Sequence, residues 1–353
     1  MRMQRLGRAW IVGLVLLGVS CRVGPSYREV RKDDWDVVFR VPEGIYSMTS
    51  SPDGALFVVA FSGGGPIYRS EPGRDTEWSK VIITQQGQPI FRTIYAPTST
   101  TVFGFGDGHL LRWDEGKGIT DFGTRGRAKW CGDYASGGSG VTALWGRGDR
   151  DVFAVGARGT ILHYNGVEWT PMRNPISDVI TDECTAPATS TLWSVGGNEH
   201  DVFAAGLRYL RLSANGRWTD IEQVRGVDDS VSSHGIAAQG ATVFFGGIRS
   251  IRTDKNSPRL YPRAGVLAFS GNGLRALTGY DNVVGMNGGG ALPGSAAVFW
   301  SFDNDLLIID GSAVRVLRLR DFRTVRGAVA MGHRIYVAGL PRDNEEDVVV
   351  RLR

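Results

Sequence analysis

Three cysteines and five histidines are the residues of this sequence best suited to metal or redox chemistry. The histidines form no His-x-His or His-Glu-x-x-His pattern, and no Cys-x-x-Cys pair occurs. Zinc sites usually depend on such closely spaced ligands. We therefore expect no metal site. The isolated histidines are His109, His163, His200, His234 and His333.

Two further patterns are typical of cofactor or ion sites but are incomplete. A glycine cluster at residues 285–290 has no helix after it, which a dinucleotide-binding turn requires. Asp303-Asn304-Asp305 lacks the downstream Gly and Glu of a calcium loop and is better interpreted as a hairpin turn. The sequence therefore predicts no cofactor and a protein that is not an enzyme.

An internal repeat is the strongest signal in the chain. Residues 144–172 and 192–221 share one frame: an aromatic-containing strand, a strand of the form Asp-Val-Phe-Ala, a hairpin, and a strand around Trp169 or Trp218. Weaker copies extend the frame over the chain, with a spacing of about 40–50 residues that matches four-stranded propeller blades. The aromatic residues expected on the second strands, and expected to pack between blades, are Phe57, Phe103, Phe153, Phe203, Phe244, Phe299 and Tyr336.

The two ends of the chain complement each other. The seventh copy stops at Arg353 after its third strand, whereas Trp35-Asp36-Val37-Val38-Phe39-Arg40-Val41 has the character of a fourth strand. We expect residues 34–41 to complete the last blade, because ring closure removes exposed sheet edges. The fold class predicted for residues 34–353 is all-β, a seven-bladed β-propeller with ring closure by the N-terminal strand.

The first twenty residues predict an export signal. Arg2, Arg5 and Arg8 precede an apolar run at residues 9–20, which is shorter than the roughly 20 residues that cross a bilayer. These arginines account for most of the formal charge of +4, so the rest of the chain is close to neutral. Overall charge therefore gives no reason to expect nucleic-acid binding.

The end of this run, Leu17-Gly18-Val19-Ser20-Cys21, resembles the bacterial lipobox, although Gly18 stands where that motif usually has Leu. The resemblance implies that residues 1–20 are removed and that Cys21 carries the lipid. It also implies attachment to the outer membrane, since residue 22 is not Asp. The alternatives are an ordinary signal peptide with a chance cysteine and an uncleaved anchor. The polar residues 22–33 are expected to be a solvated tether, so that residues 21–33 comprise the lipidated cysteine and the tether.

Cys131 and Cys184 are the other two cysteines. Each precedes the first strand of a predicted blade, and the two blades are adjacent. A disulfide between them is a hypothesis for an exported protein. The alternative is two separate buried thiols.

Two basic segments are candidates for a binding face. Residues 248–265 form a predicted insertion in blade five, and residues 125–134 lie between blades two and three. Long loops of compact domains often carry function, and arginine with aromatic residues suits an anionic glycan or an acidic protein surface. The alternative is a solvated loop with scattered charge. The candidate residues are Arg125, Arg127, Lys129, Trp130, Arg249, Arg252, Lys255 and Arg259.

The repeat frame resembles those of secreted and lipid-anchored bacterial propellers. Tyr68-Arg69-Ser70 followed by Gly73, Asp75 and Trp78 also resembles the Asp-box turn, with altered spacing. This resemblance implies architecture far more than activity.

Phe39-Arg40-Val41-Pro42, followed by Ser51-Pro52-Asp53-Gly54, resembles the opening of sialidases. In that family the motif arginine grips the substrate carboxylate, a role that would fall to Arg40. The acidic residue that the family needs in its first blade is missing from residues 61–66, and no paired tyrosine and glutamate can be assigned. The alternative is that Arg40 belongs to the closing strand.

These observations predict a lipoprotein of the cell envelope, anchored in the outer membrane and facing the periplasm or the surface. Its expected function is that of a non-catalytic scaffold that binds an unknown protein or an anionic glycan, with the membrane as its second partner and no nucleic acid. The alternative is a glycan-active propeller of the sialidase type.

Overall fold

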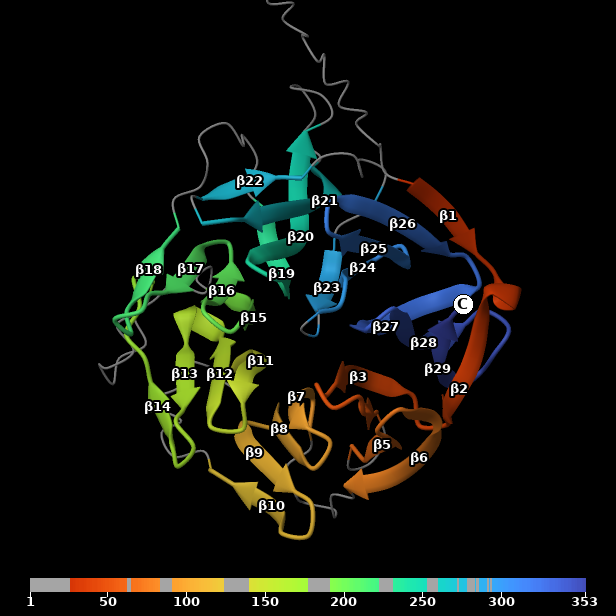
Figure 1. Cartoon of the computed structure of the whole chain (residues 1–353), viewed down its shortest axis with the longest axis horizontal. Helices are drawn as coiled ribbons and strands as arrows, with labels where there is room; N and C mark the ends of the chain where they lie inside the picture. Colours follow the sequence, from red (N-terminus) through yellow and green to blue (C-terminus); the bar gives the residue numbers. More distant parts are fainter. Residues whose placement is uncertain are drawn as a thin grey trace, which may run out of the picture.

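The computed structural model describes residues 26–61, 65–82, 91–123, 140–176, 191–221, 231–252, 260–271, 273–277, 283, 286–290, 292 and 294–353. They form seven sheets arranged radially around one axis (Figure 1). The prediction of an all-β, seven-bladed propeller is confirmed.

Blades 1 to 4 each contain four consecutive antiparallel strands, numbered from the axis outward (Figure 1). Blade 1 comprises β3 (Ile45–Ser50), β4 (Leu56–Ala60), β5 (Ile67–Glu71) and β6 (Arg74–Ile82). Blade 2 comprises β7 (Thr93–Thr98), β8 (Thr101–Gly106), β9 (His109–Asp114) and β10 (Gly118–Asp121). Blade 3 comprises β11 (Val141–Gly148), β12 (Asp151–Gly156), β13 (Ile161–Tyr164) and β14 (Trp169–Pro171), with a 3-10 turn at Ala157–Gly159. Blade 4 comprises β15 (Leu192–Gly197), β16 (Val202–Gly206), β17 (Tyr209–Leu212) and β18 (Trp218–Asp220).

Blades 5 to 7 complete the ring. Blade 5 comprises β19 (Val231–Gln239), β20 (Thr242–Arg252), β21 (Leu260–Phe269) and β22 (Leu274–Ala276). Blade 6 comprises β23 (Met286–Gly290), β24 (Ala297–Ser301), β25 (Asp305–Asp310) and β26 (Ala313–Leu319). Blade 7 comprises β27 (Phe322–Met331), β28 (Arg334–Pro341) and β29 (Asp347–Leu352).

The fourth strand of blade 7 comes from the beginning of the chain. Strand β2 (Trp35–Val41) pairs antiparallel with β29, with Trp35 opposite Leu352 and Val41 opposite Asp347. Trp35, Val38 and Val41 of this strand are buried. The predicted closure by the N-terminal strand is therefore confirmed, and hydrophobic burial as well as hydrogen bonding holds it in place.

The segment before β2 differs from the solvated tether that we expected. Residues Ser26–Val30 form strand β1, which pairs parallel with β26 and gives blade 6 a fifth strand. A 3-10 turn at Lys32–Asp34 then leads into β2. This strand was not predicted because most of its residues are polar and exposed. Val30, which is 3% exposed, is its only buried residue.

The insertion in blade 5 also differs from the expected loop. Ile248–Arg252 and Leu260–Ala264 pair with each other and prolong β20 and β21. The ladder satisfies backbone groups that a long loop would leave to water. Only residues 253–259 between these strands lie outside the described residues.

The seven aromatic residues of the repeat all lie on second strands, as predicted, and each is at most 4% exposed. In five blades the residue directly opposite on the third strand is basic, and in blades 5 and 6 it is Ala268 or Leu307. The five aromatic–basic pairs are Phe57 with Arg69, Phe103 with Arg112, Phe153 with His163, Phe203 with Arg211 and Tyr336 with Arg351.

The alternation of strand direction gives the ring two different ends. We call the end with the connections from second to third strands, and from one blade to the next, the loop face. The turn face is the opposite end, with the connections from first to second and from third to fourth strands. The innermost strands start at the loop face and surround the central axis (Figure 1).

Candidate functional site

A cavity of about 1390 Å³ lies at the centre of the ring. Residues of the innermost strands of all seven blades line it. They are joined by Phe105, Asp107 and Trp300 toward the loop face, and by connections from first to second strands, such as Glu199 and Ala241, at the turn face. The volume exceeds the usual range of 300–1,000 Å³ for small-molecule pockets, so the cavity has room for a peptide segment.

Close approach of the innermost strands shapes one side of the wall. A Cβ atom on Gly235 of blade 5 would lie 2.3 Å from the backbone nitrogen of Gly289 in blade 6. A Cβ atom on Gly289 would in turn collide with the ring of Phe299. Two members of the glycine cluster, Gly288 and Gly289, thus have a packing explanation, and both line the cavity.

Aromatic side chains line the cavity, and further apolar side chains lie exposed at the loop face. Tyr95, Trp145 and Trp300 line the wall, and Tyr46 and Trp193, each 42% exposed, stand near the loop-face ends of β3 and β15. Three more exposed apolar residues follow second strands on the same face: Phe61 (69% exposed), Leu207 (43%) and Phe302 (50%). We call these five exposed residues, four of them aromatic, the aromatic rim: Tyr46, Phe61, Trp193, Leu207 and Phe302. Tyr46 and Trp193 line the cavity.

Stacking orders part of this rim. The rings of Tyr46 and Phe61 stack with centroids 5.8 Å apart, and Trp193 stacks on His234 at 5.7 Å. Burial lowers the pKa of His234, so this cavity-lining imidazole is neutral at neutral pH. Rigid, exposed aromatic rings beside a cavity are typical anchors of protein interfaces.

The charged side chains of the cavity are few and mostly paired. The Arg92 guanidinium lies 3.0 Å from the Asp107 carboxylate, and Arg147 lies 2.5 Å from Asp151. Arg326 of β27 is exposed and forms no hydrogen bond or ion pair with a described residue. The described part of the wall can therefore accept an apolar segment, and Arg326 is its available cation.

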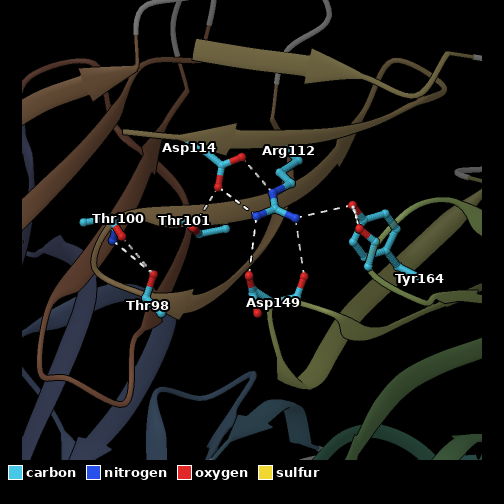
Figure 2. A network of polar contacts seen from close by, with 8 residues as sticks. Thr98, Thr100, Thr101, Arg112, Asp114, Asp149 and Tyr164 are labelled. Atoms are coloured by element: carbon cyan, nitrogen blue, oxygen red, sulfur yellow. Dashed lines mark hydrogen bonds and ion pairs between the residues drawn. The ribbon is translucent and has the colours of Figure 1, made fainter. Parts of the chain in front are cut away.

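The other charged clusters hold blades together. Figure 2 shows Arg112 of β9, whose guanidinium binds Asp114 at 2.8 Å and reaches blade 3 at Tyr164 (3.3 Å) and Asp149 (3.6 Å). Burial alone would raise the pKa of Asp114, but hydrogen bonds from Arg112 and Thr101 outweigh it and lower the pKa. Arg69 likewise crosses from blade 1 to the Ser99 carbonyl of blade 2, at 2.9 Å.

The Asp-box-like residues of blade 1 play a similar structural part. The amide of Leu56 donates to Ser70 Oγ at 2.9 Å, and Trp78 Nε1 donates to the carbonyl of Asp75 at 2.7 Å. The buried Asp75 carboxylate accepts from the Tyr336 hydroxyl at 2.7 Å and from Arg351 at 2.9 Å, both in blade 7. This turn joins the first blade to the last.

The features implied by the sialidase resemblance do not meet in one site. Arg40 is exposed on β2, the outermost strand of blade 7, and does not line the cavity, which supports the alternative that it belongs to the closing strand. Tyr68 does donate to Glu43 at 2.9 Å, but Phe39 packs on the Tyr68 ring and neither residue of the pair lines the cavity.

The other sequence-predicted sites lie largely outside the described residues. This holds for Cys21, Cys131, Cys184, Arg125, Arg127, Lys129, Trp130, Lys255 and Arg259. Arg249 and Arg252 belong to the prolonged part of β20, where the ladder places Arg249 opposite Arg263. Within the described ranges there is no group of three His, Cys, Asp or Glu residues that could hold a metal ion. Asn304 occupies a left-handed turn between β24 and β25, in agreement with the predicted hairpin.

The aromatic rim was not predicted from the sequence. Phe61, Leu207 and Phe302 each follow a second strand directly, where a polar turn residue is the usual choice. An apolar residue at that fixed place in the repeat is a signal that could have identified them.

The comparisons with known proteins support the fold. No protein-family model matches the sequence, and no curated protein matches it. A solved structure of YCF48 bound to D1 peptide superimposes with a TM-score of 0.58 at 10% identity, over 93% of this chain and 97% of that one. YCF48 from Cyanidioschyzon merolae gives 0.57 at 14% identity, over 91% and 98%. The extracellular domain of a two-component system protein of B. thetaiotaomicron gives 0.57 at 11% identity, over 91% of this chain and 40% of that one.

Proposed function

We propose that this chain is a lipid-anchored envelope propeller that binds a peptide segment of a partner protein at the loop-face opening of its central cavity, without catalysis. The observation that carries the proposal is the aromatic rim beside a cavity of about 1390 Å³. Exposed aromatic residues beside a cavity are typical of protein-binding surfaces. A propeller of similar fold, YCF48, has been solved with a D1 peptide bound, and we extend peptide binding to this chain as a proposal.

Peptide selection tests the binding site. Peptides selected on the immobilised protein from a displayed random library should lose at least tenfold in affinity for Trp193→Ala, since central aromatic anchors often contribute 2 kcal/mol or more. Val167→Ala is the matched control, because Val167 is 80% exposed and lies in a turn-face connection of blade 3. Equal affinity for both variants and the unaltered protein would refute the rim as the site.

Lipid attachment at Cys21 remains part of the proposal. No helix within the described ranges is long and apolar enough to cross a membrane. Cells fed a labelled palmitate should incorporate it into the full chain and not into Cys21→Ala. Incorporation into neither would reject the anchor while leaving the binding site untouched.

The basic segments remain a second proposed surface, for an anionic glycan or an acidic protein. The pairing of Arg249 with Arg263 brings two cationic residues to adjacent strands of blade 5. Reversal of Arg249, Arg252 and Arg259 to Glu should abolish retention on a heparin column at low salt. Unchanged retention would exclude this surface.

A further inference from the structure

Strand β1 attaches the N-terminal segment to the outer edge of blade 6 (Figure 1). Val30 is buried against blade 6 and blade 7, and the Arg318 guanidinium lies over the Tyr27 ring, 5.5 Å from its centroid. Arg320 binds Glu29 at 3.4 Å, and Arg28 binds Asp34 at 2.5 Å. The backbone ladder, one buried side chain and several polar contacts together fix this segment.

The direction of β1 shows from which end of the ring the chain arrives. Ser26 lies opposite Arg315, close to the connection between β25 and β26 on the turn face. Val30 lies opposite Leu319, whose amide donates to the carbonyl of Asn304 on the loop face. The chain thus joins the rim of blade 6 beside its turn-face connection and runs along the rim, parallel to β26, toward blade 7 (Figure 1).

We infer that the turn face of blade 6 is held against the membrane and that the aromatic rim is directed away from it. This inference rests on the proposed lipid at Cys21. Four residues lie between Cys21 and Ser26, and even a fully extended chain spans at most about 18 Å from Cys21 to Ser26. A bilayer that holds the Cys21 lipid therefore lies within that distance of the turn-face end of β1.

The composition of the two faces agrees with this orientation. Nine described large hydrophobic residues are exposed: the five of the aromatic rim belong to the loop face, Val167 lies in a turn-face connection, and Tyr27, Val37 and Ile119 lie on outer strands. In this orientation a partner protein can reach the loop-face end of the cavity. The opposite orientation would press the aromatic rim into the headgroups, where Trp and Tyr are also stable, and must be tested directly.

Energy transfer from a dye on the protein to acceptors on lipid headgroups measures the orientation. A genetically encoded azido residue at Ala313 or Phe302 places one dye at the turn-face or loop-face end of blade 6, and both positions are exposed. Strands of about six residues separate the two ends by roughly 20 Å. With the full lipidated chain in phosphatidylethanolamine–phosphatidylglycerol vesicles, transfer from position 313 should be at least twice that from position 302.

A spacer variant provides the control. About 20 Gly/Ser residues inserted between Pro25 and Ser26 leave β1 intact but lengthen the reach by roughly 25 Å, so the difference between the two positions should shrink. Equal transfer in the palmitate-labelled protein without the spacer, or stronger transfer from position 302, would overturn the inference. Absence of palmitate would instead reject the anchor itself, so the two failures can be distinguished.

Discussion

The seam between blades 7 and 1 and the loop-face opening of the cavity use polar and aromatic residues in opposite ways. At the seam, Asp36, Asp75, Tyr336, Arg351 and Arg353 form a network that we call the closure latch. Its members contact one another, and Asp75 and Tyr336 are buried. At the opening, the aromatic rim is exposed and Arg326 has no described partner.

This difference separates structural residues from candidate binding residues. The second-strand aromatic and the third-strand basic residue recur in five blades, and three of these basic residues, Arg69, Arg112 and Arg351, reach carboxylates or carbonyls of the next blade. Recurring residues that form hydrogen bonds or ion pairs with a neighbouring blade stabilise the ring. The rim residues occupy two places of the repeat in only some of the blades and are exposed, as expected for residues retained for a partner.

Deletion of residues 34–41 should have the largest effect on the stability of the ring. It removes the β2–β29 ladder, the buried Trp35, Val38 and Val41, and the Asp36 carboxylate of the closure latch. Loss of a single large buried side chain costs about 2–5 kcal/mol, so the combined loss exceeds the stability of most domains. Thermal unfolding followed by circular dichroism should lose its cooperative transition. A chain that starts at Ser26 is the control, and a sharp transition in both would contradict closure by β2.

Asp75→Ala should produce the next largest effect. It leaves the buried Tyr336 hydroxyl without its acceptor and removes one partner of Arg351, which should lower the free energy of unfolding by about 2 kcal/mol. Asp220→Ala is the matched control, because its ion pair with Arg208 is exposed and should contribute under about 1 kcal/mol. Urea titration measures both. Equal losses would mean that the latch contributes no more than a surface ion pair.

The sequence was sufficient to predict the seven-bladed ring but not strand β1, the central cavity or the aromatic rim. Two sequence signals made the ring predictable: alternation of apolar and polar residues indicates strands, and repetition of one frame indicates blades. They identify the glycine-rich turns, the Asp-Val-Phe-Ala strands and the closing strand Trp35–Val41. Strand β1 could not be predicted, because four of its five residues are exposed and its partner strand lies almost 290 residues away. The size of the cavity depends on the distance of the seven innermost strands from the axis, and this distance cannot be derived from the sequence of a single repeat.

Arg326→Gln should then affect binding without affecting folding. Arg326 has no described partner to lose, so the free energy of unfolding should change by less than about 0.5 kcal/mol. Affinity for selected peptides that contain an acidic residue should fall about tenfold, as expected for loss of a charge-assisted hydrogen bond. Arg323→Gln on the same strand is exposed and does not line the cavity, and it should leave affinity unchanged. Fluorescence anisotropy with labelled peptides distinguishes the variants.

The smallest expected effect is that of His234 on the free energy of unfolding at acidic pH. Burial lowers the pKa of this imidazole in the folded protein below its unfolded value of about 6.5. The unfolded chain therefore binds the proton more tightly, so the contribution of neutral His234 is complete above pH 6.5 and is lost as the pH falls toward the folded pKa. The slope from one such group cannot exceed about 1.4 kcal/mol per pH unit. Urea titrations between pH 7.5 and 5 should show a shallower decline for His234→Gln than for the unaltered chain, whereas His200→Gln, at an exposed turn-face position, should not differ from it. Parallel curves for all three proteins would show that the imidazole stacked on Trp193 is as accessible to protons as the solvent-exposed one.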